Sequence, residues 1–142
     1  MRINQCMRAG GTVPGCAYRA WRLGRLLIDH TYRNRFKYLV ALNGRNVEGV
    51  FCINAVAPDP IPGKVQFSLT PVNSDCFNTI ENIIDNLYGP CNLNKLMGSR
   101  YLDTDDFNAA GIQIPEITCC PQENIPLIGA DQIEQFERPQ RL

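Results

Sequence analysis

The stretch that most constrains the fold is residues 36–54, in which two apolar runs flank the dipeptide Asn43-Gly44. Asn-Gly between apolar runs is the strongest short-range signal for a β-hairpin, because a two-residue type I′ turn needs positive φ at both central residues. A turn at this dipeptide predicts that Val40 faces Val47 across the hairpin. Apolar residues fall on both faces, so we expect both faces of the hairpin to be covered.

The chain before and just after the hairpin has weaker but readable patterns. Glycines and a Pro-Gly pair in residues 1–16 predict an irregular N-terminal segment, whereas apolar spacing in residues 17–29 predicts a helix. Three prolines in residues 57–63 predict a loop that cannot belong to a central strand. Alternating apolar residues over 65–69 predict a half-buried strand.

The second half of the chain contains one strongly periodic segment. A helix is predicted from a cap at Ser74 or Asp75, with an apolar face that reaches Leu87 and a stop at Gly89 before Pro90. A shorter helix is predicted from the acidic run at Asp103 towards Gly111. Isoleucines around Pro115 in residues 112–117 indicate an edge strand. The segments 119–121 and 125–127 are expected to extend over the surface or across a partner.

Together these elements predict one α+β domain, a small mixed, curved β-sheet or partial barrel flanked by two or three helices. The chain has 142 residues, 44% of them hydrophobic, which is enough for a single core. No apolar run approaches the ~18 residues of a membrane span. The first fifteen residues lack the apolar stretch of a secretory signal, so we expect a cytoplasmic protein.

The seven cysteines are odd in number and include no C-x-x-C pair. With His30 as the single histidine, a zinc site would need thiolates from distant positions. We therefore expect reduced cysteines acting as small hydrophobic residues, with no structural disulfide, no metal and no cofactor.

Enzyme motifs are not found. The sequence contains neither G-x-G-x-x-G nor G-x-x-x-x-G-K-[ST], and no G-x-S-x-G. A thiol enzyme would have to use His30, and nothing in the sequence selects its cysteine partner. The acidic run Asp103-Thr104-Asp105-Asp106 is typical of a solvated helix start rather than of paired catalytic carboxylates. We expect a protein that is not an enzyme.

Charge is distributed unevenly along the chain. Residues 1–51 hold nine Arg or Lys against two Asp or Glu, a net charge of +7, whereas residues 52–142 carry −7. Eleven of the fourteen basic residues are arginine, whose planar fork suits phosphates and bases. Either the two halves neutralise each other or the basic half binds an anionic ligand.

A binding surface can be assembled from the basic half. In the predicted helix Arg19, Arg22 and Arg25 recur at three-residue steps, and Trp21 lies beside them. Aromatic rings stack on bases while arginine holds phosphates, so this combination favours nucleic acid or a nucleotide. Core packing remains the alternative role for Trp21 and for Tyr38, which the predicted register places over Gly49.

The order Ala20-Trp21-Arg22, a helix, then Tyr38-Leu39-Val40-Ala41-Leu42-Asn43-Gly44-Arg45-Asn46-Val47-Glu48-Gly49-Val50-Phe51 resembles small PUA-like domains of the EVE and ASCH types. The likeness covers roughly residues 17–102 of the single domain 1–142, with 103–142 as a C-terminal extension. It implies binding of RNA, a modified base or a nucleotide in a pocket on a small barrel. Trp21, Tyr38 and Arg45 are then pocket or rim residues.

The function predicted from sequence is thus non-enzymatic binding of nucleic acid or a nucleotide. Its expected ligand-binding residues are Arg19, Trp21, Arg22, Arg25, Tyr38 and Arg45. The alternative is a protein-interaction or small-ligand-sequestering module of the kind found among phage accessory proteins. Such a module would dock on a larger partner through its C-terminal segment, or form a homo-oligomer.

Overall fold

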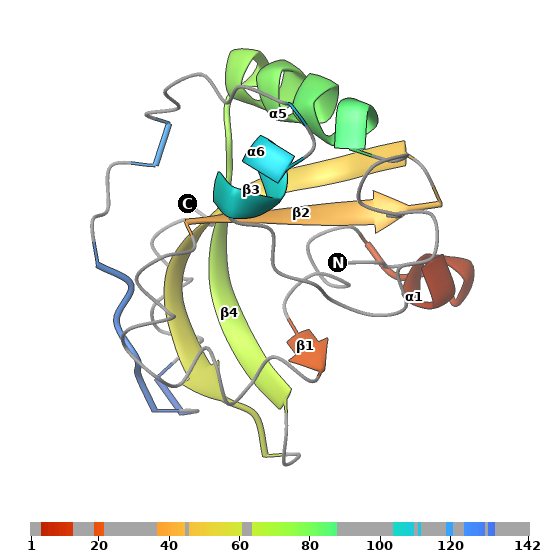
Figure 1. Cartoon of the computed structure of the whole chain (residues 1–142). Coiled ribbons are helices and arrows are strands. Elements are labelled where there is room, and N and C mark those ends of the chain that lie inside the picture. Colours follow the sequence, from red (N-terminus) through yellow and green to blue (C-terminus); the bar gives the residue numbers. More distant parts are fainter. Residues whose placement is uncertain are drawn as a thin grey trace.

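The computed structural model describes residues 4–12, 19–21, 37–44, 46–60, 64–87, 104–109, 111, 119–120, 124–129 and 131–132. The strands are β1 (Arg19–Trp21), β2 (Tyr38–Asn43), β3 (Asn46–Pro58) and β4 (Lys64–Pro71), and the helices are α1 (Asn4–Arg8), α5 (Ser74–Leu87) and α6 (Thr104–Ala109). The strands form one sheet in the order β1-β4-β3-β2, with every neighbouring pair antiparallel (Figure 1). The sheet bends along β3 and β4, so the predicted α+β fold with a curved sheet is confirmed.

The predicted hairpin is present, but its predicted register is wrong. Asn43 pairs with Asn46, so the two-residue loop begins at Gly44, whose φ is 64°. Glycine adopts this positive φ without steric cost, and it does so at the first loop position rather than the second. A bulge then leaves Glu48 without a partner, and Val40 pairs with Val50 instead of Val47.

The expected loop at 57–63 begins later than predicted. β3 continues through Ala57 to Pro58, which pairs with Val65 of β4. A proline is tolerated here because it is the last residue of its strand. A second bulge falls at Asn54, whose side-chain amide donates a hydrogen bond of 2.7 Å to the hydroxyl of Thr70 on β4.

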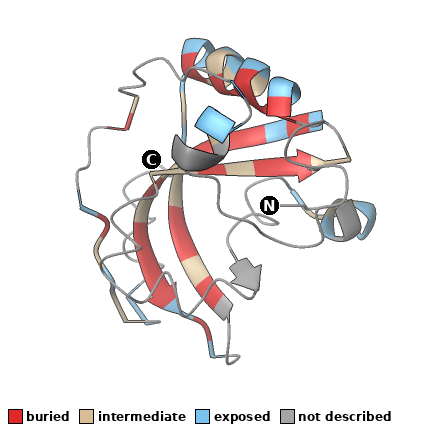
Figure 2. Ribbon diagram, viewed as in Figure 1, coloured by how far each residue is buried: buried red, intermediate tan, exposed pale blue. Residues whose placement is uncertain are grey.

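Both faces of the sheet are covered, as predicted, and each carries a separate core (Figure 2). The helix-side core lies under α5 and consists of Leu42, Val47, Val50, Cys76, Ile80, Ile83, Ile84 and Leu87. The α1-side core lies on the other face and consists of Leu39, Ala41, Phe51, Ile53, Val56, Val65, Phe67 and Ile125, with Met7 of α1 packed against it. The sheet therefore forms the middle layer of the domain.

Helix α5 starts one residue earlier than the cap predicted at Ser74 or Asp75 would place it. The side chain of Asn73 accepts a hydrogen bond of 2.9 Å from the backbone amide of Cys76, which is the contact of an N-cap residue. The apolar face predicted to reach Leu87 is confirmed, because Leu87 is fully buried, whereas the stop predicted at Gly89 and Pro90 lies outside the described residues. Helix α6 confirms the predicted helix after Asp103, and Phe107 packs against the helix-side core.

The predicted irregular N-terminal segment is wrong for the described residues, because residues 4–8 form α1. The Gly10-Gly11 pair ends this helix instead of preventing it. Gly11 donates to the carbonyl of Cys6 and Gly10 to that of Met7, each at 3.0 Å, and Gly10 has a φ of 87°. These two bonds form a Schellman motif, which requires a left-handed residue at the position of Gly10.

The described part of the C-terminal extension packs on the sheet rather than over the surface or across a partner, which corrects the prediction. Residues 124–129, here called the C-terminal strap, run parallel to β3 at a bridge between Val56 and Leu127. Val56 donates to the carbonyl of Pro126 at 3.0 Å, and Ile128 donates to that of Val56 at 2.9 Å. The strap thus pairs with a part of β3 that β2 does not reach, because β2 begins at Tyr38, opposite Cys52 (Figure 1).

One buried hydroxyl has no hydrogen-bond partner. Ser68 of β4 is fully buried, and its Oγ is unpaired. Burying such a group without a partner costs about 1–3 kcal/mol. We therefore expect Ser68→Ala to raise the free energy of unfolding by about 1 kcal/mol in urea denaturation.

Thr70→Ala is the matched control on the same strand, because the Thr70 hydroxyl accepts the bond from Asn54. This variant should lose about 1 kcal/mol. A loss of stability in Ser68→Ala as large as that of the control would contradict the assignment of Ser68 as unpaired.

Candidate functional site

The sequence-predicted binding residues separate into three groups. Arg19 and Trp21 lie on β1, Tyr38 lies on β2, and Arg22, Arg25 and Arg45 lie outside the described residues. β1 is next to β4 and β2 is next to β3, so Tyr38 and Trp21 are on opposite outer strands of the sheet. The described strands therefore do not bring these two aromatic residues together.

The helix predicted over 17–29 is wrong at residues 19–21. These residues are extended and pair with β4, with Arg19 opposite Gln66 and Trp21 opposite Lys64. Pairing with the edge of β4 supplies backbone hydrogen bonds, and these override the local preference for a helix. The three-residue spacing was expected to place Arg19 on one helical face with Arg22 and Arg25. That argument does not apply at Arg19, because side chains in a strand repeat every two residues.

Tyr38 belongs to the interface between the sheet and α5. Its side chain is half-buried and packs against the helix-side core, and its cross-strand partner is Cys52 rather than Gly49. The expected stacking over Gly49 is therefore wrong. This position matches the packing role that the sequence also allowed for Tyr38.

A buried carboxylate lies beside the β1 end of the sheet. Asp59 follows β3, is only 8% exposed, and accepts a hydrogen bond of 2.9 Å from the side-chain amide of Gln66. Gln66 is also the cross-strand partner of Arg19. Asp59 was not among the residues predicted for a site, because it belongs to the segment 57–63 that was predicted to be a loop.

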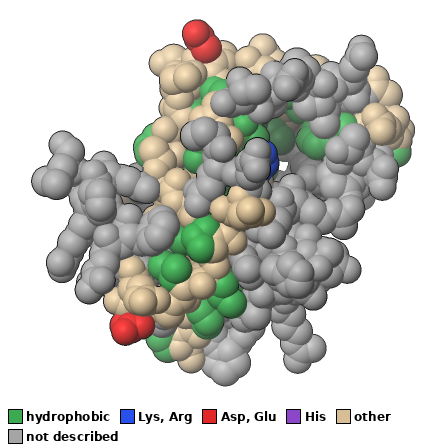
Figure 3. Space-filling model, turned by 90° about the vertical axis from the view of Figure 1, so that its left-hand side faces the viewer, with side chains coloured by type: hydrophobic (Ala, Val, Ile, Leu, Met, Phe, Trp, Pro, Cys, Tyr) green, Lys and Arg blue, Asp and Glu red, His purple; other side chains and the backbone are tan. Residues whose placement is uncertain are grey.

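Most acidic side chains in the described part are not engaged with basic ones. Glu48, Asp75, Glu81, Asp85 and Asp131 are exposed or half-exposed and form no ion pair. Among basic residues there, Arg8 is exposed and Lys37 half-buried, again without an ion pair. On the face in Figure 3 the acidic side chains in view lie apart from the basic one.

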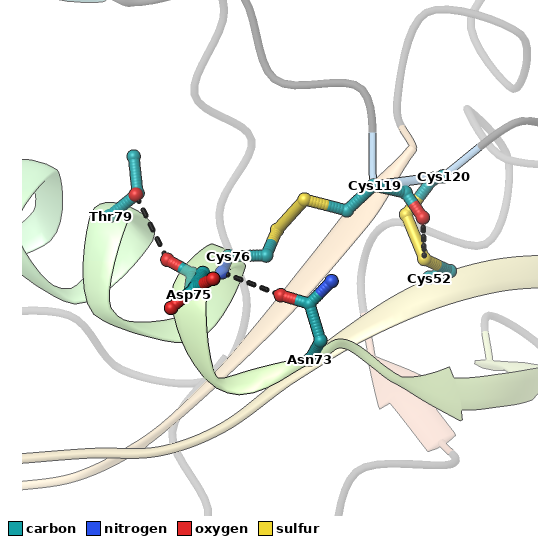
Figure 4. The surroundings of a disulfide bond; sticks show 7 residues. All are labelled: Cys52, Asn73, Asp75, Cys76, Thr79, Cys119 and Cys120. Atoms are coloured by element: carbon teal, nitrogen blue, oxygen red, sulfur yellow. Dashed lines mark hydrogen bonds between the residues drawn. A yellow bond between two sulfur atoms is a disulfide. The ribbon is translucent and has the colours of Figure 1, made fainter.

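The cysteines overturn the expectation of reduced thiols. Cys52 is bonded to Cys120 and Cys76 to Cys119 (Figure 4). Cys6 is also in a disulfide. Sequence separations of 68 and 43 residues explain why spacing gave no indication of these pairs. The adjacent pair Cys119-Cys120, anchored in two different elements, was the feature that sequence reasoning passed over.

Within the described ranges, no group of three or more His, Cys, Asp or Glu side chains is arranged to hold a metal ion. None of the helices in that same part of the chain has the length and apolar character needed to cross a lipid bilayer.

Comparison with known proteins adds no relative. No protein-family model, no curated protein and no solved structure matches the chain significantly. The resemblance to PUA-like domains therefore stays a prediction from sequence.

Proposed function

We propose that this chain is a non-enzymatic binding domain for nucleic acid or a nucleotide, held by the basic N-terminal half. The observation that carries the proposal is the lack of ion pairs at four exposed or half-exposed carboxylates of the described part. Asp75, Glu81, Asp85 and Asp131 all come from the acidic half, and none of them neutralises a basic residue. The alternative in which the two halves cancel each other finds no support at these four positions.

The register of β1 supplies a second line of support. It sets Arg19 and Trp21 on the strand next to Lys64, at one end of the sheet. Cationic groups neutralise phosphates, and an indole ring stacks on a base. This end of the sheet thus gathers the residue types that the chemistry of a nucleotide needs.

The disulfides bear on where such a domain would act. Disulfides form and persist in oxidising compartments and are rare in the cytosol. The cytoplasmic location expected from the sequence rested on the first fifteen residues, which lack the apolar stretch of a secretory signal, and the disulfides Cys52–Cys120 and Cys76–Cys119 argue against it. We infer that the domain binds its ligand outside the reducing cytosol.

The proposal predicts salt-sensitive binding of a fluorescently labelled single-stranded oligonucleotide, measured by anisotropy. Each neutralised phosphate adds about −0.7 to the slope of log affinity against log salt, so Arg22→Ala and Arg25→Ala should each flatten the slope. Trp21→Ala should weaken binding by roughly 1–3 kcal/mol with little change in slope, as expected for lost stacking.

Arg138→Ala is the control, since it removes the same charge from the acidic half. It should leave both affinity and slope nearly unchanged. Absorbance at 260 nm of the freshly purified protein checks for a ligand that is already bound. No binding at low salt and no excess absorbance would reject the proposal and favour the protein-interaction module.

A further inference from the structure

Two neighbouring cysteines attach the C-terminal part of the chain to the body of the domain. Cys120 is bonded to Cys52 on β3, and Cys119 to Cys76 in the first turn of α5 (Figure 4). Cys52 Sγ also lies 3.7 Å from the carbonyl oxygen of Cys119, so the two disulfides are adjacent.

The two anchor points belong to one rigid part of the fold. β3 pairs with β4 along its length, with Cys52 opposite Thr70. The link from β4 to α5 is itself fixed, because Val72 donates a hydrogen bond of 3.1 Å to the carbonyl of Val50. Either disulfide therefore ties the cysteine pair to the same body.

The strap begins four residues after Cys120. Its described anchors include Ile125, which is 2% exposed in the α1-side core, and the two backbone bonds at Val56. Leu127 in its middle is 39% exposed. Such a short segment gains most of its local concentration at β3 from a covalent tether.

We propose that the two disulfides form a redundant redox lock on the C-terminal strap. Either disulfide alone holds the strap against β3, and the strap is released only after both are reduced. Release frees the backbone amide and carbonyl of Val56 from their partners on the strap.

The chemistry requires a dithiol reductant, such as a protein with a reactive pair of thiols. One thiolate attacks a disulfide sulfur and the other sulfur leaves as a thiolate. The second thiol of the reductant then resolves the mixed disulfide. Each disulfide opened thus consumes one dithiol, takes up two electrons and two protons, and yields two cysteine thiols and one oxidised dithiol.

Each disulfide joins one half-buried cysteine to one buried cysteine. Cys119 and Cys52 are half-buried, whereas Cys76 and Cys120 are 4% and 7% exposed. We therefore expect the reductant to attack Cys119 and expel the thiolate of Cys76, and to attack Cys52 and expel that of Cys120.

The redundancy follows from the length of the chain between the bonded cysteine and Ile125. Cys119 and Cys120 are adjacent, so losing either disulfide changes this length by at most one residue. With both bonds lost, the described contacts upstream of the strap are the non-covalent packing of Cys119 and that of Phe107 of α6, both against the helix-side core. When the packing of Cys119 opens as well, the loop grows from roughly 5 to roughly 18 residues, which lowers the local concentration of the strap roughly tenfold.

Hydrogen exchange of three backbone amides of β3 and the strap tests the lock by NMR. Val56 and Ile128 report on the bridge, and Ile53, which donates to the carbonyl of Lys37 at 3.0 Å, reports on the β2–β3 pairing. The variants are C52S/C120S, C76S/C119S and the quadruple variant, all compared with the oxidised protein.

In both double variants, we expect exchange at Val56 and Ile128, relative to Ile53, to change less than threefold. In the quadruple variant the same ratio should rise roughly tenfold. A rise of that size in either double variant would overturn the redundancy, and an unchanged ratio in the quadruple variant would overturn the lock.

If the quadruple variant does not fold, stepwise reduction of the unmodified protein with dithiothreitol replaces it. Alkylation and mass spectrometry then identify molecules with one or both of these disulfides open. The strap peptide should lose protection only in the doubly reduced molecules. Equal loss in singly reduced molecules, or no loss ahead of the sheet in doubly reduced ones, would reject the proposal.

Discussion

Removing both described disulfides is expected to lower the free energy of unfolding by about 7 kcal/mol. Taken alone, loops of 68 and 43 residues each restrict the unfolded chain, which is worth about 4 kcal/mol apiece. When one bond is present, the other closes only a loop of roughly 25 residues, through Cys52 to Cys76 and the cysteine pair, and adds about 3.5 kcal/mol. Urea denaturation of the quadruple Cys→Ser variant measures the total.

A loss of this size is comparable with the whole stability of a small domain, about 5–15 kcal/mol. The C52S/C120S and C76S/C119S variants should each lose only about half as much and remain folded. Dithiothreitol should destabilise the unmodified protein far more than the quadruple variant, which retains only the Cys6 disulfide among those described. If the midpoint of the unmodified protein does not move once mass spectrometry shows both bonds open, the prediction fails.

Phe67→Ala is expected to destabilise the domain by about 3–5 kcal/mol. Phe67 of β4 is 3% exposed in the α1-side core and pairs with Val56 in the centre of the sheet. Its removal leaves a cavity between a strand and residues that cannot collapse into it, because the sheet fixes their spacing. Chemical denaturation monitored by circular dichroism gives the change in free energy.

Leu87→Ala provides a comparison on the other face of the sheet. Leu87 is fully buried in the helix-side core, and its loss should cost about 2–5 kcal/mol. The two changes should add, because the cores do not share residues. Leu127→Ala on the exposed part of the strap is the control and should change stability by less than about 1 kcal/mol. A Phe67→Ala loss as small as this would place Phe67 outside the core.

The hairpin shows what local sequence can and cannot predict. Alternating apolar residues and Gly44 predicted its existence and place correctly. The register failed first at the turn, where Asn43 pairs with Asn46 and the loop is shifted by one residue, and again at Glu48, where a bulge inserts one more residue. A bulge at a charged, exposed position has no distinct pattern in sequence. The long-range pairing of β3 with β4, with its own bulge at Asn54, selects that register in the folded sheet.

Tertiary contacts determine the structure of the segments for which the sequence predictions were wrong. Residues 17–29 have a helical apolar spacing, but pairing with β4 makes residues 19–21 a strand. The strap was expected to extend over the surface or across a partner, yet it bonds to β3, where the carbonyl of Pro126 accepts a hydrogen bond from Val56. The disulfides depend on the same long-range packing and could not be inferred from spacing.

The candidate site was predicted less well than the fold. Of its six residues, Arg19 and Trp21 lie on an outer strand and Tyr38 lies under α5, while Arg22, Arg25 and Arg45 fall outside the described residues. A ligand-binding surface depends on which residues of distant segments lie close together in the fold. A single sequence does not show these long-range contacts directly. The charge asymmetry carries over from the sequence to the proposal, together with Arg19 and Trp21 on β1.

The way β3 is covered has a consequence for solubility. The first half of β3 pairs with β2, and Val56 pairs with the strap. Two different segments therefore satisfy the backbone hydrogen bonds along this side of β3. A strand with unpaired amides and carbonyls is a template on which other chains can add as further strands. Ala55, Val56 and Ala57 are fully buried and carry no charge, the composition that favours such growth. We therefore expect the strap to limit aggregation by pairing with Val56. Loss of this pairing should favour self-association before the sheet itself unfolds.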